Sequence, residues 1–198
     1  ASTSSVYGNS KKFPLEETDN TDNPLTFYAA TKKSNEVMAY SYSNIYKLPC
    51  TALRFFTVYG PYGRPDMSIF KFIKSMKENK KFQLFNNGNH VRDFTYVEDV
   101  TMAITKLINK PSNKAIPYSC FNIASGRPIK LMKIIESLEQ NLNKKAIFNK
   151  LNLQKGDVIK THSSNKKLKN YIKYSPKFNI DKGLKEIVRW YNNYFKKF

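Results

Sequence analysis

Apolar residues recur every three or four positions in six segments of the chain, which is the spacing of one face of an α-helix. In the second segment the repeat is carried by Phe70, Ile73 and Met76. Thr26 is a suitable N-cap for the first segment, and Pro49 ends it. Helices are predicted over residues 26–46, 67–79, 98–109, 131–141, 164–172 and 181–197.

Short apolar runs of strand length lie between these segments. Cys50–Val58 is a continuous run, as expected for one strand buried on both faces of a parallel sheet. Asn86-Asn87-Gly88 predicts a turn between two further strands. Strands are predicted over 50–58, 82–85, 91–96, 118–124 and 145–148, after a strand end and its loop at residues 1–8. This alternation of strands and helices predicts an α/β fold.

The first predicted helix carries the pattern Tyr28-x-x-x-Lys32. Residues four apart lie about one helical turn apart, so the phenol and the ammonium project from one face. A cation beside a phenol favours the phenolate, which can act as a general base toward a sugar hydroxyl. The pattern is short and both residues are frequent here, so a surface helix with a solvated lysine is the alternative.

Four further motifs set this pattern in context. A hydroxyl-rich stretch, Ala1–Gly8, precedes it, and Leu53–Met67 runs from an apolar strand into a Gly-Pro loop. Phe85-Asn-Asn-Gly88 and Arg92-Asp-Phe-Thr-Tyr96 follow. In their order and over nearly all 198 residues, these motifs resemble the extended short-chain dehydrogenase/reductase family of nucleotide-sugar enzymes. The UDP-glucuronate 4-epimerase branch of that family is the most similar.

The resemblance implies an NAD-dependent isomerase that inverts C4 of UDP-glucuronate to give UDP-galacturonate through a transient 4-keto sugar. It implies a catalytic triad of Thr3, Tyr28 and Lys32, of which Tyr28 and Lys32 also contact the NAD cofactor. It further implies a UDP-sugar substrate and a homodimer when the enzyme is complete. The substrate-binding residues that it implies are Ser4, Ser5, Thr57, Arg64, Phe85, Arg92 and Asp157.

Two arginines decide much of the expected specificity. A guanidinium is a planar, permanently charged group that matches a carboxylate, so Arg64 is expected to recognise C6 of glucuronate. The alternative is a loop arginine paired with Asp66. Arg92 matches the position that binds the diphosphate of the nucleotide sugar, and the alternative there is a strand-edge ion pair with Asp93 or Asp99.

The chain contains no Gly-x-x-Gly-x-x-Gly turn, which the resembled enzymes use to bring backbone N–H groups to the NAD pyrophosphate. We therefore expect the C-terminal portion of a longer enzyme. Residues 1–60 are expected to complete a Rossmann-type parallel sheet. Residues 61–198 are expected to form a smaller α/β nucleotide-sugar binding region, with about 92–124 as a candidate for packing back on that sheet.

The net charge of +19 invites a nucleic-acid hypothesis. Only five of the 34 basic residues are arginine, however, and the lysines are scattered along the chain. Nucleic-acid readers depend on arginine for bidentate contacts, so nucleic acid is not an expected partner. No run of 18 apolar residues occurs, so a membrane is not an expected partner either. Some positive field remains to attract an anionic nucleotide sugar.

Isolated cysteines and histidines add little chemistry. Cys50 and Cys120 lie in apolar contexts and are expected to be buried thiols in a reducing cytoplasm. His90 and His162 have no ligand spacing and are expected to be ordinary surface or loop residues, with no metal site.

Two other functions remain open. A UDP-glucose/galactose-type 4-epimerase or a dehydratase would share the fold, although a dehydratase is expected to carry an Asp-Glu pair where this chain has Ser4-Ser5. A chain without the first strands of the sheet is also compatible with an inactive, truncated remnant.

Overall fold

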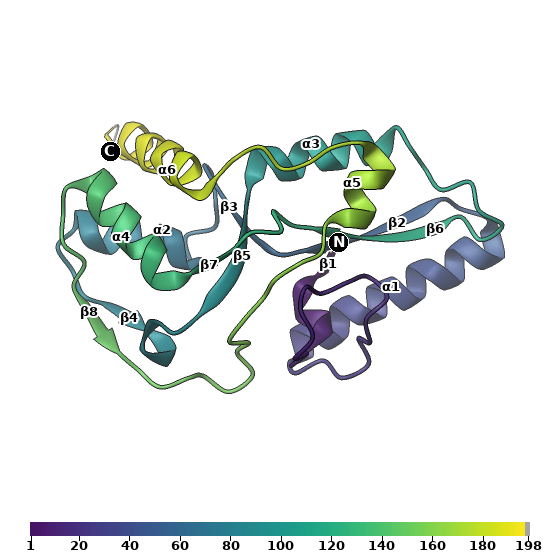
Figure 1. Ribbon diagram of the computed structural model, residues 1–198, viewed down its shortest axis with the longest axis horizontal. Coiled ribbons are helices and arrows are strands. Elements are labelled where there is room, and N and C mark those ends of the chain that lie inside the picture. Colours follow the sequence, from purple (N-terminus) through teal and green to yellow (C-terminus); the bar gives the residue numbers. More distant parts are fainter. Residues whose placement is uncertain (197–198) are drawn as a thin grey trace.

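The computed structural model describes residues 1–196, which form a mixed α/β fold (Figure 1). No helix within those residues is long and apolar enough to cross a membrane. The six predicted helices are confirmed, each with bounds within about two residues of those expected, and residue 197 of the last predicted helix lies outside the described residues. They are α1 (Phe27–Tyr46), α2 (Ser68–Lys77), α3 (Val97–Ile108), α4 (Leu131–Leu142), α5 (Lys166–Ile172) and α6 (Ile180–Phe195).

The first sheet is parallel and has the strand order β1-β2-β6. Its strands are β1 (Ser2–Thr3), β2 (Cys50–Phe55) and β6 (Tyr118–Ile123). Helix α1 runs along one face, and α3 and α5 lie on the other (Figure 1). The face below α3 and α5 buries Val100, Leu107 and Phe121, with Leu168 and Ile172 from α5. The prediction of a parallel sheet is therefore confirmed.

The expected continuous strand 50–58 is wrong in one respect, because it divides at Phe56. Its first half is β2, and its second half is β3 (Thr57–Tyr59), which pairs with a different sheet. The Phe56 N–H still donates to the Ile123 carbonyl at 3.2 Å, and beyond it the chain pairs with β5. Both β2 and β3 need apolar residues, so the hydrophobic run does not indicate where the chain passes from one sheet to the other.

The second sheet has the order β3-β5-β7. Strand β5 (Val91–Tyr96) runs parallel to β3 and antiparallel to β7 (Pro128–Lys130), a short strand that the apolar pattern did not predict. Helices α2, α4 and α6 pack with this sheet into the largest core, in which Ile73, Ile134 and Leu184 are fully buried. The helix α6 passes so close to β3 that a Cβ at Gly183 would lie 2.0 Å from the Tyr59 hydroxyl.

The strands on either side of Asn86-Asn87-Gly88 do not pair with each other. Strand β4 (Phe82–Leu84) instead pairs in parallel with β8 (Phe148–Lys150), which lies slightly later than the expected 145–148. Between β4 and β5 the short helix η2 (Phe85–Gly88) contains Asn86 and Asn87 at φ of 49° and 52°. The chain thus leaves one sheet and enters another between β4 and β5. The expected division of the molecule into two regions at residue 60 stays a prediction.

Candidate functional site

Helix α1 carries Tyr28 and Lys32 one turn apart, with Tyr28 exposed and Lys32 half-buried. The helix begins where the Thr26 side chain accepts a hydrogen bond from the Ala29 N–H at 3.2 Å, as the N-cap prediction required. The Lys32 Nζ lies 5.9 Å from the centroid of the Tyr28 ring. Tyr28 is 55% exposed, and within residues 1–196 neither its hydroxyl nor the Lys32 ammonium has a hydrogen-bond partner. Both polar groups are free to meet a ligand.

Thr3 is buried at the end of β1, where the 3₁₀ helix η1 (Ser4–Tyr7) begins. Its Oγ1 caps η1 by accepting from the Ser5 N–H and lies 3.3 Å from the Ser5 Oγ. Ser4 and Ser5 line a cavity together with Thr26, two residues before Tyr28. The hydroxyl cluster and the start of α1 therefore border the same space.

The inner face of α1 is held by a buried ion pair. Arg54 on β2 donates from Nε and Nη2 to the two carboxylate oxygens of Glu36, at 2.9 and 2.8 Å, and Ser2 donates to the same carboxylate. Burial by itself would raise the pKa of Glu36, but the bonds from Arg54 and Ser2 outweigh it and lower that pKa. Glu36 lies one turn beyond Lys32, and its bonds fix α1 against β2 through Arg54 and against β1, the strand that carries Thr3, through Ser2.

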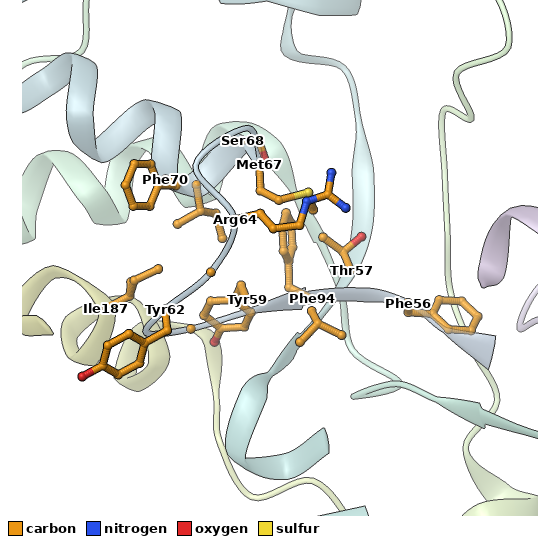
Figure 2. Close-up of a pocket in the computed structure, with 14 residues that line it drawn as sticks. Phe56, Thr57, Tyr59, Tyr62, Arg64, Met67, Ser68, Phe70, Phe94 and Ile187 are labelled. Carbon is orange, nitrogen blue, oxygen red and sulfur yellow. The ribbon is translucent and has the colours of Figure 1, made fainter. Parts of the chain in front are cut away.

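Three cavities adjoin one another around Thr57, which lines all of them. Their volumes are about 360, 320 and 150 Å³. The first is shown in Figure 2 and is lined by Arg64 and Thr57 and by the aromatic residues Tyr59, Tyr62 and Phe94. Together the three bring seven predicted substrate-binding residues to one groove: Ser4, Ser5, Thr57, Arg64, Phe85, Arg92 and Asp157.

Arg64 at the mouth of this groove is exposed, and its side chain forms an ion pair with Asp66. The hydrogen bond from Arg64 lowers the pKa of Asp66. The same bond is the main cause that raises the pKa of Arg64, and the nearby Tyr28 adds a smaller effect in that direction. Arg64 thus lies close to the Tyr28 end of the groove, while its pairing with Asp66 matches the alternative considered for it.

Arg92 lies on β5 and is largely buried. Its Nη2 donates to Asp157 Oδ1 at 2.9 Å, and its Nη1 donates to the carbonyls of Ile159 at 2.9 Å and Val91 at 3.2 Å. The alternative partners for Arg92, Asp93 and Asp99, are therefore wrong. Burial lowers the pKa of Arg92, and the contacts with Asp157 offset this only in part. A buried cation that is incompletely compensated is favourable for anion binding.

Asp93 serves a structural purpose instead. Its carboxylate is fully buried and accepts hydrogen bonds from the backbone N–H groups of Ser125, Gly126 and Ser163, with no cation among its hydrogen-bond donors. Burial raises the pKa of Asp93, against the effect of these donors. The carboxylate joins β5 to the loop after β6 and to the segment before α5.

His90 is not a surface residue, contrary to our expectation. Its side chain is 5% exposed and lines the groove, with Nε2 3.0 Å from Asp157 Oδ2. The backbone explains the burial, because the His90 carbonyl accepts from the Leu131 N–H and thereby draws this position under α4. A signal was present in the sequence: His90 precedes Arg92 by two positions, which places both on one side of an extended strand.

Arg92 and the hydroxyls of Ser4, Ser5 and Thr57 line one cavity, whereas Tyr28 lines none of the three and lies two residues beyond Thr26 at the edge of that cavity. Within residues 1–196 no group of three or more His, Cys, Asp or Glu side chains is placed to hold a metal ion.

Residues 1–124 match a family described as NAD dependent epimerase/dehydratase. The chain belongs to that family. "Protein CapI" of Staphylococcus aureus is a relative 45% identical over 100% of this chain and 63% of its own length. A "Probable UDP-glucuronate 4-epimerase" of Rhizobium meliloti (strain 1021) is 38% identical over 100% of this chain and 62% of its own length.

Among solved structures, UDP-glucuronic acid 4-epimerase from Bacillus cereus, in complex with UDP-glucuronic acid and NAD, is 32% identical with a TM-score of 0.90. That match covers 98% of this chain and 60% of the other. The likeness confirms the predicted epimerase-family resemblance and the Rossmann-type α/β class. The chain spans about three fifths of the length of such family members.

Proposed function

We propose that this chain carries the UDP-sugar site of an NAD-dependent 4-epimerase that interconverts UDP-glucuronate and UDP-galacturonate. The observation that supports it is the groove around Thr57, where seven residues assigned to substrate binding from their motifs line three adjoining cavities. Relatives and solved structures named for this activity support the choice of substrate. A cytoplasmic enzyme that dimerises when complete is part of the same proposal.

In this proposal the nucleotide lies toward Phe85, Arg92 and Asp157, with the diphosphate at Arg92. The sugar lies toward Thr57, with its carboxylate at Arg64, which must exchange Asp66 for the substrate. The two carboxylates are chemically alike, so the exchange conserves the hydrogen bonds of the guanidinium.

Tyr28 removes the proton from the sugar O4, and the Thr3 hydroxyl donates to the oxygen as charge develops on it. Lys32 stabilises the phenolate. NAD⁺, when bound beside Tyr28 and Lys32, would supply a reversible hydride acceptor for C4. Tyr28 then gives its proton back to O4, so the reaction is redox-neutral overall.

The residues of this chain fit one end of that cofactor. Tyr28 is exposed and Lys32 is half-buried, and within residues 1–196 neither side chain has a hydrogen-bond partner, as groups that contact a nicotinamide ribose require. The sequence contains no glycine-rich turn for the pyrophosphate. We therefore assign Tyr28 and Lys32 to the nicotinamide end alone.

The test has two stages. First, titration calorimetry measures UDP binding to the purified chain. Second, the chain is mixed with NAD⁺, UDP-glucuronate and the separately made nucleotide-binding half of a related epimerase, and UDP-galacturonate is followed by chromatography. We expect product from the wild type and none from Tyr28→Phe. A well-folded mixture that binds NAD⁺ and UDP without turnover would contradict the proposal and favour an inactive remnant.

Sugar specificity is tested with Arg64→Ala in the same mixture. Loss of activity on UDP-glucuronate with activity kept on UDP-glucose would support carboxylate recognition by Arg64. Equal losses on both sugars would favour a neutral UDP-hexose epimerase.

A further inference from the structure

The buried cation of the groove is already partly neutralised. A guanidinium has five N–H donors, and Arg92 uses three of them on Val91, Ile159 and Asp157. The remaining two are available to a phosphate group. An anion that approaches Arg92 nevertheless meets the Asp157 carboxylate, which shares a cavity with it. The like charges repel one another, and the repulsion grows as they approach. A second donor that holds the carboxylate in place limits that approach.

His90 lies where such a second donor is needed. Its Nε2 is 3.0 Å from Asp157 Oδ2, on the carboxylate oxygen that Arg92 does not use. The atom is buried and makes no aligned hydrogen bond with any residue in 1–196, so the contact with Asp157 lies off the N–H axis. Burial, together with Arg92, lowers the pKa of His90. In either protonation state an imidazole carries at least one N–H that can donate.

Asp157 itself has little other support. It lies in the irregular segment between β8 and α5, its side chain is 33% exposed, and it follows Gly156 at a φ of 79°. Its carboxylate contacts are those to Arg92 and His90. A small rotation of the carboxylate would align Oδ2 with the His90 N–H while Arg92 turns its free donors to a ligand.

We propose that His90 is a positioning residue of the nucleotide site: it holds Asp157 so that Arg92 can bind the diphosphate of a nucleoside diphosphate. The inference rests on the proposed function. It assigns to His90 no contact with the substrate and no part in the chemistry. Its effect passes through Asp157 and is felt at the phosphates, not at the base.

The test compares His90→Gln with His90→Asn. The amide nitrogen of glutamine takes the place of Nε2, whereas that of asparagine takes the place of Nδ1 and falls short of Asp157. The affinities of the full 198-residue chain for UDP and for uridine are measured by calorimetry. We expect His90→Asn to weaken UDP binding about ten-fold, as the loss of one charged hydrogen bond does, and His90→Gln to restore it. Uridine binding should be unchanged in both.

A double-mutant cycle separates positioning from simple packing. In an Asp157→Asn background, His90→Asn should change UDP affinity no further. An equal loss in that background, or an equal loss for uridine, would overturn the proposal. Thermal unfolding of each variant is measured, and His90→Phe, which fills the space without a donor, replaces His90→Asn should the latter fail to fold.

The outcomes also separate this inference from the proposed function. If the wild-type chain binds no UDP, both fail at the nucleotide site. If it binds UDP and all His90 variants bind equally well, only the role of His90 is overturned.

Discussion

Arg54 and Arg92 are both buried arginines on strands, yet they belong to two different kinds of region. Arg54, beneath α1, directs four hydrogen bonds to Glu36, Tyr7 and Glu17, all within the fold. Burial acts against its charge, but the hydrogen bonds that Arg54 donates to Glu36 outweigh this and raise the pKa of Arg54. Arg92 makes fewer bonds, and its pKa is lowered instead.

The comparison distinguishes an arginine whose charge is used within the fold from one whose charge is available to a ligand. Around Arg54 the polar groups satisfy one another, and within residues 1–196 the side chains of Tyr28 and Lys32 on the same helix have no hydrogen-bond partners. Around Arg92 the compensation is incomplete and faces a cavity. A guanidinium whose burial is fully compensated stabilises the fold, and one that is undercompensated stabilises a bound anion.

The largest expected effect is on the folding stability of the Arg54 region. Arg54→Met leaves Glu36 as a buried, unpaired carboxylate, which we expect to lower the free energy of unfolding by about 3–5 kcal/mol. Arg92→Met is the matched control. It should lower the free energy of unfolding by less, because the carboxylate that loses its arginine partner, Asp157, is 33% exposed. Denaturant titration of the two variants checks this. Equal losses would erase the distinction between the two arginines.

The second sheet, β3-β5-β7, and the helices packed on it should instead be sensitive to changes in packing. In Gly183→Ala the new Cβ would meet the Tyr59 hydroxyl, which lies 2.0 Å from that position. Overpacking of this kind typically costs about 1–3 kcal/mol. Denaturant titration of Gly183→Ala alone and with Tyr59→Phe, which removes the nearest atom, measures it. A Gly183→Ala variant as stable as the wild type would mean that α6 can move away from β3.

Acid should weaken the Arg54 region through Glu36. The folded state lowers the pKa of Glu36, so its contribution to stability is present above the unfolded-state pKa and is lost as the pH falls through the folded-state value. Asp93 has a raised pKa and acts with the opposite sign over its own range. We expect Glu36→Gln to flatten the decline of stability below about pH 4.5, measured as unfolding midpoints against pH. An unchanged slope would show that other carboxylates cause the decline.

The smallest effect is expected for the exposed ion pair in the groove. Arg64 and Asp66 are both well exposed, so Arg64→Ala should leave the thermal midpoint unchanged while it alters sugar preference. A clear fall in the midpoint would place Arg64 with Arg54 as a structural residue.

Much of the architecture could be predicted from local patterns. Helical periodicity located all six helices, and the cap at Thr26 defined where α1 begins. The pairing of strands could not be predicted in the same way. The run 50–58 is apolar throughout, and whether its second half pairs with β6 or β5 depends on segments more than 30 residues away.

The candidate site shows the same limit. Motif order nominated Thr57, Arg92 and Asp157, but their meeting in one groove depends on the packing of β5 against the segment before α5. The prediction for His90 was wrong because an isolated histidine in a sequence does not indicate whether its side chain is buried. Only the turn of the chain under α4 removes it from water and brings it to Asp157.

The sequence by itself determined the elements, the family and the chemical groups at hand, because helical repeats, caps and motif residues are short-range properties of the chain. The tertiary structure alone decided which buried charges are compensated. Compensation depends on the number of donors and acceptors that distant segments bring within hydrogen-bond distance. For that reason Arg54 holds α1 against the sheet, whereas Arg92, which is also an arginine in a strand, is a candidate anion-binding residue.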